Sequence, residues 1–268
     1  MSGFLHNLDL YKQGGQSHLY KTMLDGIQIV VKTPIQGRPS SLKAFRKELT
    51  IIQNLPPHPN VQTPMQVGEN ADLEFYTALW VEQSLSDYVG CAEQIGDAIP
   101  QILLGICEGI KHIHNQGVLH LDVKPANILL SDNFRPVIID FGLSRLLGSP
   151  PDQLSALPEG TYQYMAPELW NLGRASAATD IYSLGLTVLH LLTGKLPFMT
   201  SSIESVKQGH LNIKHPLIPQ NSEWHRLNYW LSKTVAPNPA QRFFNMNDTI
   251  DELCVGLDLS KTYIKKEG

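Results

Sequence analysis

The sequence predicts an α+β fold, in which a small lobe of antiparallel sheet plus one helix precedes a larger, mainly helical lobe. Short runs of apolar and β-branched residues fill the first third of the chain. The Asp25-Gly26 pair joins two of these runs and is a strong hairpin signal. After about residue 84 the apolar residues recur at helical spacing instead.

The small lobe alternates strand pairs with one helix. Strands are expected at 19–24, 27–33, around 63–68 and around 73–81. The amphipathic helix between the two pairs has apolar positions at Leu42, Phe45, Leu49 and Ile52. We expect Ser40 or Ser41 to cap this helix and Pro56 to end it.

The larger lobe is predicted to be built from helices around two short strands. The helices are expected at 97–116, 179–192, 202–208, 224–235 and 247–256, and the strands at 127–130 and 136–139. Residues 142–160 are rich in Gly, Pro and Ser and predict a long loop. Loops of that length inside a compact domain are usually functional.

Composition narrows the class of protein. With 21 Lys plus Arg against 25 Asp plus Glu, the net charge is −4, which gives no support to a nucleic-acid partner. Three scattered cysteines are too few for a disulfide framework or a zinc site. No signal peptide or membrane span is expected, so the prediction is a cytoplasmic or nuclear protein whose oligomeric state is open.

The stretch HLDVKPAN, residues 120–127, concentrates polar groups inside an apolar frame. Asn127 and the later Asp140 offer amide and carboxylate oxygens, which can hold Mg²⁺ and leave room for phosphate oxygens. Asp122 is then free to accept a proton from a hydroxyl, and Lys124 can neutralise a transferring phosphate. The pattern therefore indicates phosphoryl transfer.

Four motifs occur in an order that resembles the eukaryotic-type serine/threonine protein kinases: IVVK (29–32), HLDVKPAN (120–127), DFG (140–142) and APE (166–168). The resemblance covers roughly residues 8–255. It implies a single bilobal protein kinase domain over 1–268, with a small lobe at about 8–83, a large lobe at 84–255 and a polar tail at 256–268. It also implies ATP and Mg as cofactors and protein substrates.

The resemblance implies a role for each residue of the catalytic loop. Asp122 would be the catalytic base, Lys124 would steady the moving phosphate, and Thr161 would hydrogen-bond near both. Asn127 and Asp140 would be the metal ligands.

The nucleotide contacts implied by the resemblance lie mainly in the small lobe. Lys32 would grip the α- and β-phosphates and pair with Glu48, although both could instead be surface charges. The others are Leu19, Val30 and Leu129 around the adenine, Gly14 and Ser17 in the covering loop, and Glu82 in a hinge at 81–83. Val81 is expected to guard the back of the pocket.

Two supporting positions follow from the same resemblance. Glu168 would pair with Arg242, and loss of one partner of such a buried pair costs about 3–5 kcal/mol. Asp180 would support the catalytic loop from a buried helix, although a lone Asp in that place could equally be a helix N-cap.

The chain departs from the family pattern at three sites. Val30 replaces the usual alanine before Val31 and Lys32, and its bulkier side chain would press on the adenine. Lys12, Gly14 and Ser17 stand at the three glycine positions of the nucleotide-covering loop, so weaker or altered ATP binding is expected. Leu121 stands where kinases switched by phosphorylation carry Arg, which makes this a non-RD sequence. Activity should therefore not need phosphate on Ser144, Ser149 or Ser155.

Three functions remain in view. Lys124 followed by Pro125, together with Thr161, favours a serine/threonine kinase that acts on protein hydroxyls. The degraded glycine loop is the support for a pseudokinase that binds nucleotide without turnover. A small-molecule kinase is disfavoured by Glu168 and Arg242, because such enzymes generally lack that pair.

Overall fold

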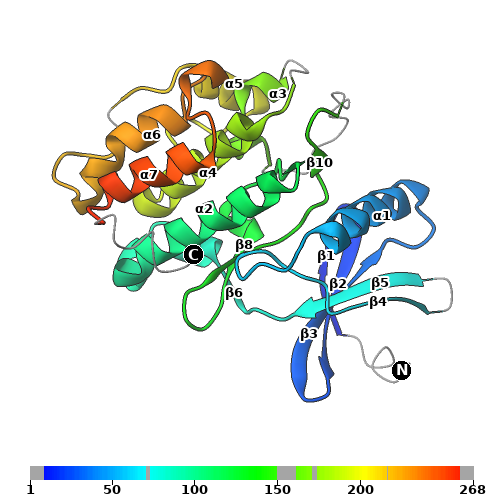
Figure 1. Cartoon of the computed structure of the whole chain (residues 1–268). Coiled ribbons are helices and arrows are strands. Elements are labelled where there is room, and N and C mark those ends of the chain that lie inside the picture. Colours follow the sequence, from blue (N-terminus) through cyan, green and yellow to red (C-terminus); the bar gives the residue numbers. More distant parts are fainter. Residues whose placement is uncertain (1–8, 71–72, 150–160, 171–173, 216, 260–268) are drawn as a thin grey trace.

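The computed structural model describes residues 9–70, 73–149, 161–170, 174–215 and 217–259. A five-stranded antiparallel sheet with one helix forms the N-terminal part, and helices dominate the rest (Figure 1). The predicted α+β fold is therefore confirmed. The division of the chain at residues 83 and 255 stays a prediction.

The N-terminal sheet has the strand order β1-β2-β3-β5-β4. Its strands are β1 (Asp9–Gln13), β2 (Ser17–Leu24), β3 (Ile27–Pro34), β4 (Gln66–Asn70) and β5 (Leu73–Leu79). The turn between β2 and β3 is the predicted one: Asp25 and Gly26 both have positive φ, 50° and 82°, as a tight hairpin turn requires. Strand β1, which precedes all the predicted strands, was missed.

Helix α1 (Pro39–Asn54) packs against β3 and buries Phe45, Glu48, Ile51 and Ile52. The prediction that Ser40 or Ser41 caps it is wrong. Arg38 is the N-cap residue, without a side-chain capping bond, and Pro39 is the first helical residue. The Ser41 side chain is fully buried and bonds outside the helix.

Two small sheets lie at the junction with the helical part (Figure 1). The first pairs β6 (Gln83–Ser84), β8 (Ile128–Leu130) and β9 (Pro136–Ile138), and the second pairs β7 (Val118–Leu119) with β10 (Arg145–Leu146). The loop between β7 and β8 carries the HLDVKPAN stretch, so antiparallel pairing fixes both of its ends.

The helical part is organised around two long helices. They are α2 (Ile99–Asn115) and α4 (Ala177–Thr193), and the others are α3 (Pro167–Trp170), α5 (Ile203–Leu211), α6 (Asn228–Thr234) and α7 (Met246–Gly256). Helix α4 is buried along most of its length, as its apolar sequence predicts. None of the helices in the described residues is long and apolar enough to cross a membrane.

A buried histidine joins α5 to the segment before α3. His210 lies on α5 and is fully buried; its Nδ1 lies 2.7 Å from the Tyr182 hydroxyl and its Nε2 lies 2.9 Å from the Tyr162 carbonyl oxygen. Burial lowers the pKa of His210 to about 4, although the Tyr162 carbonyl acts in the opposite direction. The neutral ring therefore accepts from Tyr182 and donates to Tyr162, which holds the 3₁₀ turn η5 (Thr161–Tyr164) against α4.

Close packing of α4 against α6 depends on Gly185. A Cβ atom at this position would lie 2.3 Å from the Thr234 hydroxyl oxygen and 2.8 Å from a Val235 methyl carbon. We expect Gly185→Ala to lower the free energy of unfolding by about 1–3 kcal/mol through overpacking, measured by urea denaturation. Gly96→Ala is the matched control, because a Cβ there meets nothing within 4 Å. Equal midpoints for the two variants would contradict this packing.

The low pKa of His210 predicts a loss of stability in acid. Unfolding restores an ordinary pKa near 6.5, so the unfolded chain binds more protons between about pH 6.5 and 4. Stability should therefore fall as pH falls, by about 1–2 kcal/mol between pH 7 and 5. His210→Gln should reduce this pH dependence, whereas the exposed control His215→Gln should leave it intact. Parallel pH profiles for wild type and His210→Gln would refute the assignment.

Candidate active site

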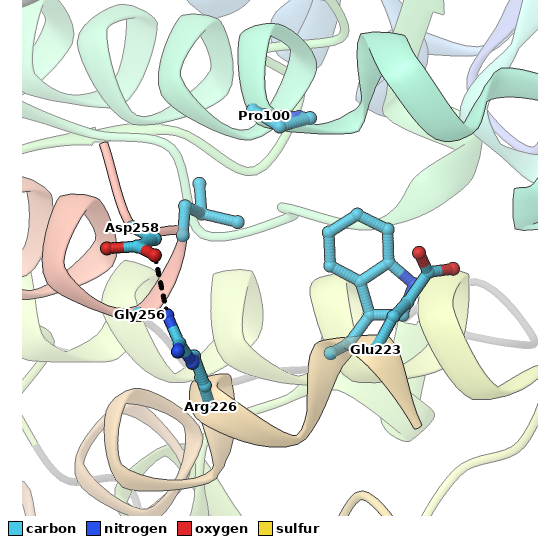
Figure 2. Close-up of a pocket in the computed structure, with 7 residues that line it drawn as sticks. Pro100, Glu223, Arg226, Gly256 and Asp258 are labelled. Carbon is cyan, nitrogen blue, oxygen red and sulfur yellow. Dashed lines mark hydrogen bonds and ion pairs between the residues drawn. The ribbon is translucent and has the colours of Figure 1, made fainter. Parts of the chain in front are cut away.

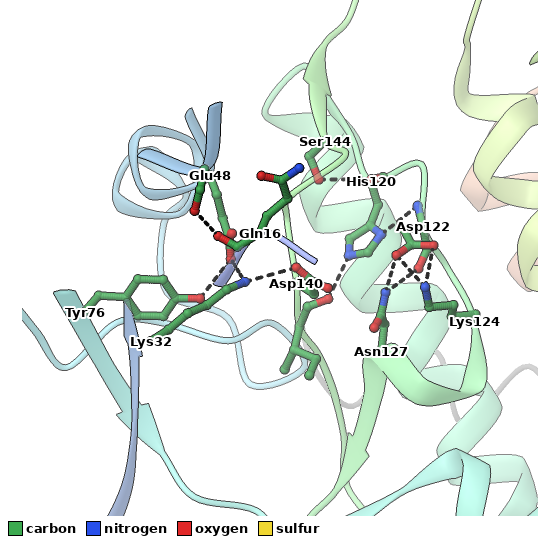
Figure 3. Close-up of polar contacts among 12 residues, drawn as sticks. Gln16, Lys32, Glu48, Tyr76, His120, Asp122, Lys124, Asn127, Asp140 and Ser144 are labelled. Carbon is green, nitrogen blue, oxygen red and sulfur yellow. Dashed lines mark hydrogen bonds and ion pairs between the residues drawn. The ribbon is translucent and has the colours of Figure 1, made fainter. Parts of the chain in front are cut away.

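Lys32 and Glu48 form a buried ion pair between β3 and α1, with 2.6 Å between Lys32 Nζ and Glu48 Oε1 (Figure 3). The Tyr76 hydroxyl donates to the same carboxylate oxygen at 2.9 Å. Burial raises the pKa of Glu48 while Lys32 opposes that rise. Burial alone would lower the pKa of Lys32, but Asp140 and Glu48 raise it well above its usual range. Lys32 is therefore a permanent cation in this site.

Asp140 is the second carboxylate on Lys32, at 3.1 Å, and its side chain is 42% exposed. The Lys32 ammonium is the main cause that lowers the pKa of Asp140 to about 2, against the effect of burial. Its φ of 66° lies in the left-handed region, which is uncommon for a residue other than glycine. This backbone conformation turns an ionised carboxylate towards the β3 lysine.

Asp122, Lys124 and Asn127 form one hydrogen-bonded group in the β7–β8 loop (Figure 3). Lys124 Nζ lies 2.8 and 3.0 Å from the two carboxylate oxygens of Asp122. The Asn127 amide nitrogen donates to the Asp122 carbonyl at 2.9 Å and to its carboxylate at 2.8 Å. Burial raises the pKa of Asp122, and Lys124 partly opposes the rise. The loop thus holds a carboxylate with increased proton affinity beside a cation.

Asp180 holds the start of this loop from inside α4. Its fully buried carboxylate accepts from the backbone N–H groups of His120 at 2.9 Å and Leu121 at 2.7 Å, and lies 2.7 Å from His114 Nε2. Burial would raise the pKa of Asp180, but the bonds from His114 and Leu121 lower it. Ser176 is the N-cap of α4, so the N-cap alternative for Asp180 is wrong and the loop-support reading is confirmed.

Leu121 follows this anchor with a φ of 65°, a left-handed conformation that costs about 1–2 kcal/mol for a residue with a side chain. The carboxylate of Asp180 accepts from the N–H groups of His120 and Leu121 and so holds the strained residue in place. His120 packs edge-on against Phe141, with ring centroids 5.0 Å apart. The loop conformation thus depends on buried contacts made by His120 and by the Leu121 N–H.

Ser144 has a structural contact that the sequence did not indicate. Its fully buried hydroxyl donates to the His120 carbonyl at 3.0 Å, so it braces the loop and is not accessible to modification. Ser149 is exposed. Ser155 lies outside the described residues.

The predicted apolar nucleotide contacts are half-buried. Leu19 pairs with Lys32 across β2 and β3, so Leu19, Val30 and Lys32 share one face of the sheet. Leu129 lies on β8, opposite Ser84, next to the connection between the two parts. That the side chains of Leu19, Val30 and Leu129 surround an adenine stays a prediction.

The connection between β5 and β6 spans residues 80–82, one residue earlier than the predicted hinge. The β5 residue that pairs with Val30 is the fully buried Ala78, whereas Val81 lies beyond the strand end. Ala78 therefore shares the sheet face of Val30, and the expected role of Val81 at the back of a pocket stays a prediction. The Glu82 side chain is 71% exposed and bonds Lys21 and the Trp80 indole N–H, at 3.1 and 2.8 Å.

The covering turn lies between β1 and β2. Lys12 is exposed on β1, Gly14 N–H donates to the Ser17 carbonyl at 2.8 Å, and Ser17 begins β2. In Figure 3, Gln16 of this turn lies between Glu48 and Asp140. The predicted loop therefore faces the Lys32 end of the site.

The segment before α3 is tied to the helical core. Glu168 and Arg242 form the predicted ion pair, with both guanidinium contacts at 2.9 Å, and Arg242 is almost fully buried. Thr179 also donates to Glu168 at 2.8 Å. Thr161 begins η5, but its side chain lies outside the described residues, so its predicted bonds stay a prediction.

The oxygen donors of Asn127 and Asp140 fit a magnesium ion. Both Asn127 hydrogen bonds use its amide nitrogen, which leaves the amide oxygen for another partner. Asp140 is ionised at neutral pH, and its carboxylate is partly exposed. Within the described residues no group of three His, Cys, Asp or Glu could hold a metal, so a magnesium ion would need substrate or water oxygens as well.

A separate shallow hollow lies far from this group on the helical part (Figure 2). It is lined by Pro100, Glu223, Trp224, Arg226, Gly256, Leu257 and Asp258. Arg226 and Asp258 pair across it at 2.7 Å, and both side chains are more than half exposed. None of its lining residues belongs to the candidate active site.

Sequence reasoning missed Tyr76 and His114 in the site. Tyr76 pairs with Lys32 across β3 and β5, so a correct strand register would have found it. His114 lies in the last turn of α2 and contacts Asp180, 66 residues later in the chain, and no local pattern signals that contact.

Comparisons with known proteins agree with this geometry. Residues 12–253 match the protein kinase domain. Serine/threonine-protein kinase PrkC of Bacillus subtilis (strain 168) is 29% identical over 237 residues, which are 84% of this chain and 35% of that protein. A protein kinase and PP2C-like domain-containing protein of Arabidopsis thaliana is 30% identical over 212 residues, 72% of this chain and 32% of the relative.

A third relative is serine/threonine-protein kinase PknD of Protochlamydia amoebophila, 26% identical over 264 residues, 87% of this chain and 25% of that protein. The chain thus spans about a third or less of the length of these relatives. The matched region includes each polar residue of the group around Lys32 and Asp122. This chain belongs to the protein kinase domain family.

Proposed function

We propose that this chain is an ATP- and magnesium-dependent serine/threonine protein kinase, and that residues 8–255 act as one catalytic domain. The observation that carries the proposal is that two polar groups lie near enough for Lys124 to lower the pKa of Asp140 and for Asp140 to raise that of Asp122 (Figure 3). The first is the closed Lys32–Glu48–Asp140 cluster, and the second is the buried Asp122 that Lys124 and Asn127 hold. Together they provide the positioning and the charges that phosphoryl transfer needs.

The proposed reaction transfers the γ-phosphoryl group of ATP to a substrate hydroxyl. The hydroxyl oxygen bonds to the γ-phosphorus, the bond from that phosphorus to the bridging oxygen breaks, and ADP leaves. Asp122 accepts the hydroxyl proton, and its raised pKa supports that role. Lys124 lies within 3.0 Å of both Asp122 oxygens, close enough to offset charge on the transferring phosphoryl group.

Lys32 is proposed to bind the α- and β-phosphates, while Glu48 fixes its position. Asn127 and Asp140 are proposed to hold magnesium, which supplies neutralisation of phosphate charge when bound. Leu19, Val30 and Leu129 would receive the adenine from the two sides of the connection at residues 80–82. The half-buried state of all three supports this, since a lining residue stays partly accessible.

Serine and threonine are the proposed acceptors. Lys124-Pro125 has the form of the catalytic loop that serine/threonine kinases carry, and the printed names of PrkC and PknD describe serine/threonine-protein kinases. The Glu168–Arg242 pair and the His210 brace hold residues 161–168 in a defined conformation beside the site. An ordered segment there favours a protein substrate over a small molecule.

Activity is further proposed to be independent of phosphate on the 142–160 segment. Leu121 has no charge and no side-chain donor, so it cannot dock a phosphate as an arginine would. The catalytic loop is instead held by the buried Asp180. A pseudokinase remains the alternative, and its support is the replacement of glycine by Lys12 and Ser17 in the covering turn.

Removal of single carboxylates tests the enzyme proposal. Asp122→Asn and Asp140→Asn should each lower labelled-phosphate transfer to a protein substrate by about 100-fold or more, because they remove the base and a metal ligand. Asp132→Asn is the matched control, an exposed carboxylate ten residues beyond Asp122. Circular dichroism should show that all three variants are folded. Full transfer by Asp140→Asn would contradict the assignment of Asp140 as a metal ligand, whereas no transfer by wild type despite ATP binding would favour the pseudokinase.

Substitution at Ser149 tests the regulatory proposal. Ser149→Ala and phosphatase treatment should leave the transfer rate of the purified protein unchanged, because Leu121 provides no phosphate dock. Ser144→Ala is a different case and should lower stability, since its hydroxyl bonds the His120 carbonyl. A large loss of rate in Ser149→Ala that Ser149→Asp restores would show that another cation binds the phosphate.

A further inference from the structure

The turn that covers the nucleotide site is bonded to the start of α1. Arg38 Nη1 donates to the Gly15 carbonyl at 2.9 Å, and the Ser41 hydroxyl donates to the Gln16 carbonyl in a short hydrogen bond. Ser41 is fully buried, and its oxygen accepts from the Ile35 N–H at 2.7 Å. Its hydroxyl therefore acts as donor and acceptor at once, which fixes its orientation.

These bonds determine which way the peptide planes of the turn face. In a trans peptide the carbonyl and the N–H of the next residue point in opposite directions. Because α1 binds the carbonyls of Gly15 and Gln16, the N–H groups of Gln16 and Ser17 point away from α1. Leu19, three residues after Gln16, pairs with Lys32, so the turn lies at the Lys32 end of the site, where Figure 3 also shows Gln16.

Adjacent backbone N–H groups that face one space form a binding site for anionic oxygens. Glycine usually gives the backbone of such a turn its conformational freedom. Of the three positions where the family has glycine, this chain has glycine only at Gly14. We propose that Ser41 and Arg38 act as a latch that replaces this freedom, by holding the Gln16 and Ser17 N–H groups towards the phosphates of bound ATP. Both are positioning residues.

The latch also connects the turn to the ion pair. Ser41 precedes Glu48 by seven residues on α1, which is two helical turns, so both side chains lie on the same face about 10 Å apart. A shift of α1 that breaks the Lys32–Glu48 contact would therefore also withdraw the turn. The position of one helix then sets both the lysine and the backbone groups that meet the phosphates.

This inference rests on the proposed function, because it concerns the nucleotide of that reaction. The test is equilibrium binding to the full chain by calorimetry, with two probes: ATP with Mg²⁺, and adenosine, which has no phosphates. Ser41→Ala should bind ATP with Mg²⁺ about tenfold more weakly, because two hydrogen bonds of a buried hydroxyl are lost. Its affinity for adenosine should not change. Ser40→Ala is the control, an exposed serine beside it on the same helix.

Arg38→Met tests the other half of the latch without risk to the core, because Arg38 is exposed. This variant should also bind ATP with Mg²⁺ more weakly, and its affinity for adenosine should not change. Lys43→Met, which removes an exposed cation from the same helix, should have a smaller effect and controls for loss of positive charge. If Ser41→Ala does not fold, the comparison of Arg38→Met with Lys43→Met decides the question.

The latch would be overturned if Ser41→Ala lowered the affinities for ATP and for adenosine equally, or if it lowered neither. Wild-type protein that binds neither probe would overturn the latch and the proposed function together. Wild-type protein that binds ATP with Mg²⁺ but transfers no phosphate contradicts the enzyme proposal alone. In that case a loss of ATP affinity confined to the latch variants still supports the latch.

Discussion

The Lys32–Glu48 ion pair is the contact on which the rest of the site depends. It joins β3 to α1 at 2.6 Å, and Lys32 also reaches Asp140 on the helical side at 3.1 Å. One cation between two carboxylates holds three separate elements together. An uncompensated buried charge would remain if either Lys32 or Glu48 were removed, which is why breaking such a pair costs more than forming it gains.

A second buried charge, Asp180 on α4, holds the catalytic loop in place. Asp180 accepts two backbone N–H groups and contacts His114, so α2, α4 and the loop meet at one carboxylate. Hydrogen bonds to a carboxylate favour its ionised form even where burial does not. This anchor offsets the cost of the left-handed Leu121, and so it places Asp122 with its side chain towards Lys124 and Asn127.

The sequence predicted the features whose residues lie close together in the chain. Asp122, Lys124 and Asn127 lie within six residues, and the hairpin at Asp25-Gly26 follows from turn chemistry alone. Ser41 was predicted as a cap because its sequence neighbours favour one, yet its partner is a carbonyl 25 residues upstream. Its actual contact depends on how β1, β2 and α1 pack, which no local pattern contains.

The contacts of Leu121 and Ser41 indicate that hydrogen bonds within the fold order both the loop and the turn of this site. Asp180, Ser144 and Phe141 hold the loop between β7 and β8 from fully or almost fully buried positions. Burial shields these contacts from salt and from modifying enzymes, so folding itself sets the loop. The covering turn differs, because one of its two bonds comes from the exposed Arg38. The turn is therefore held in part by an exposed contact, whereas the contacts that hold the loop between β7 and β8 are buried.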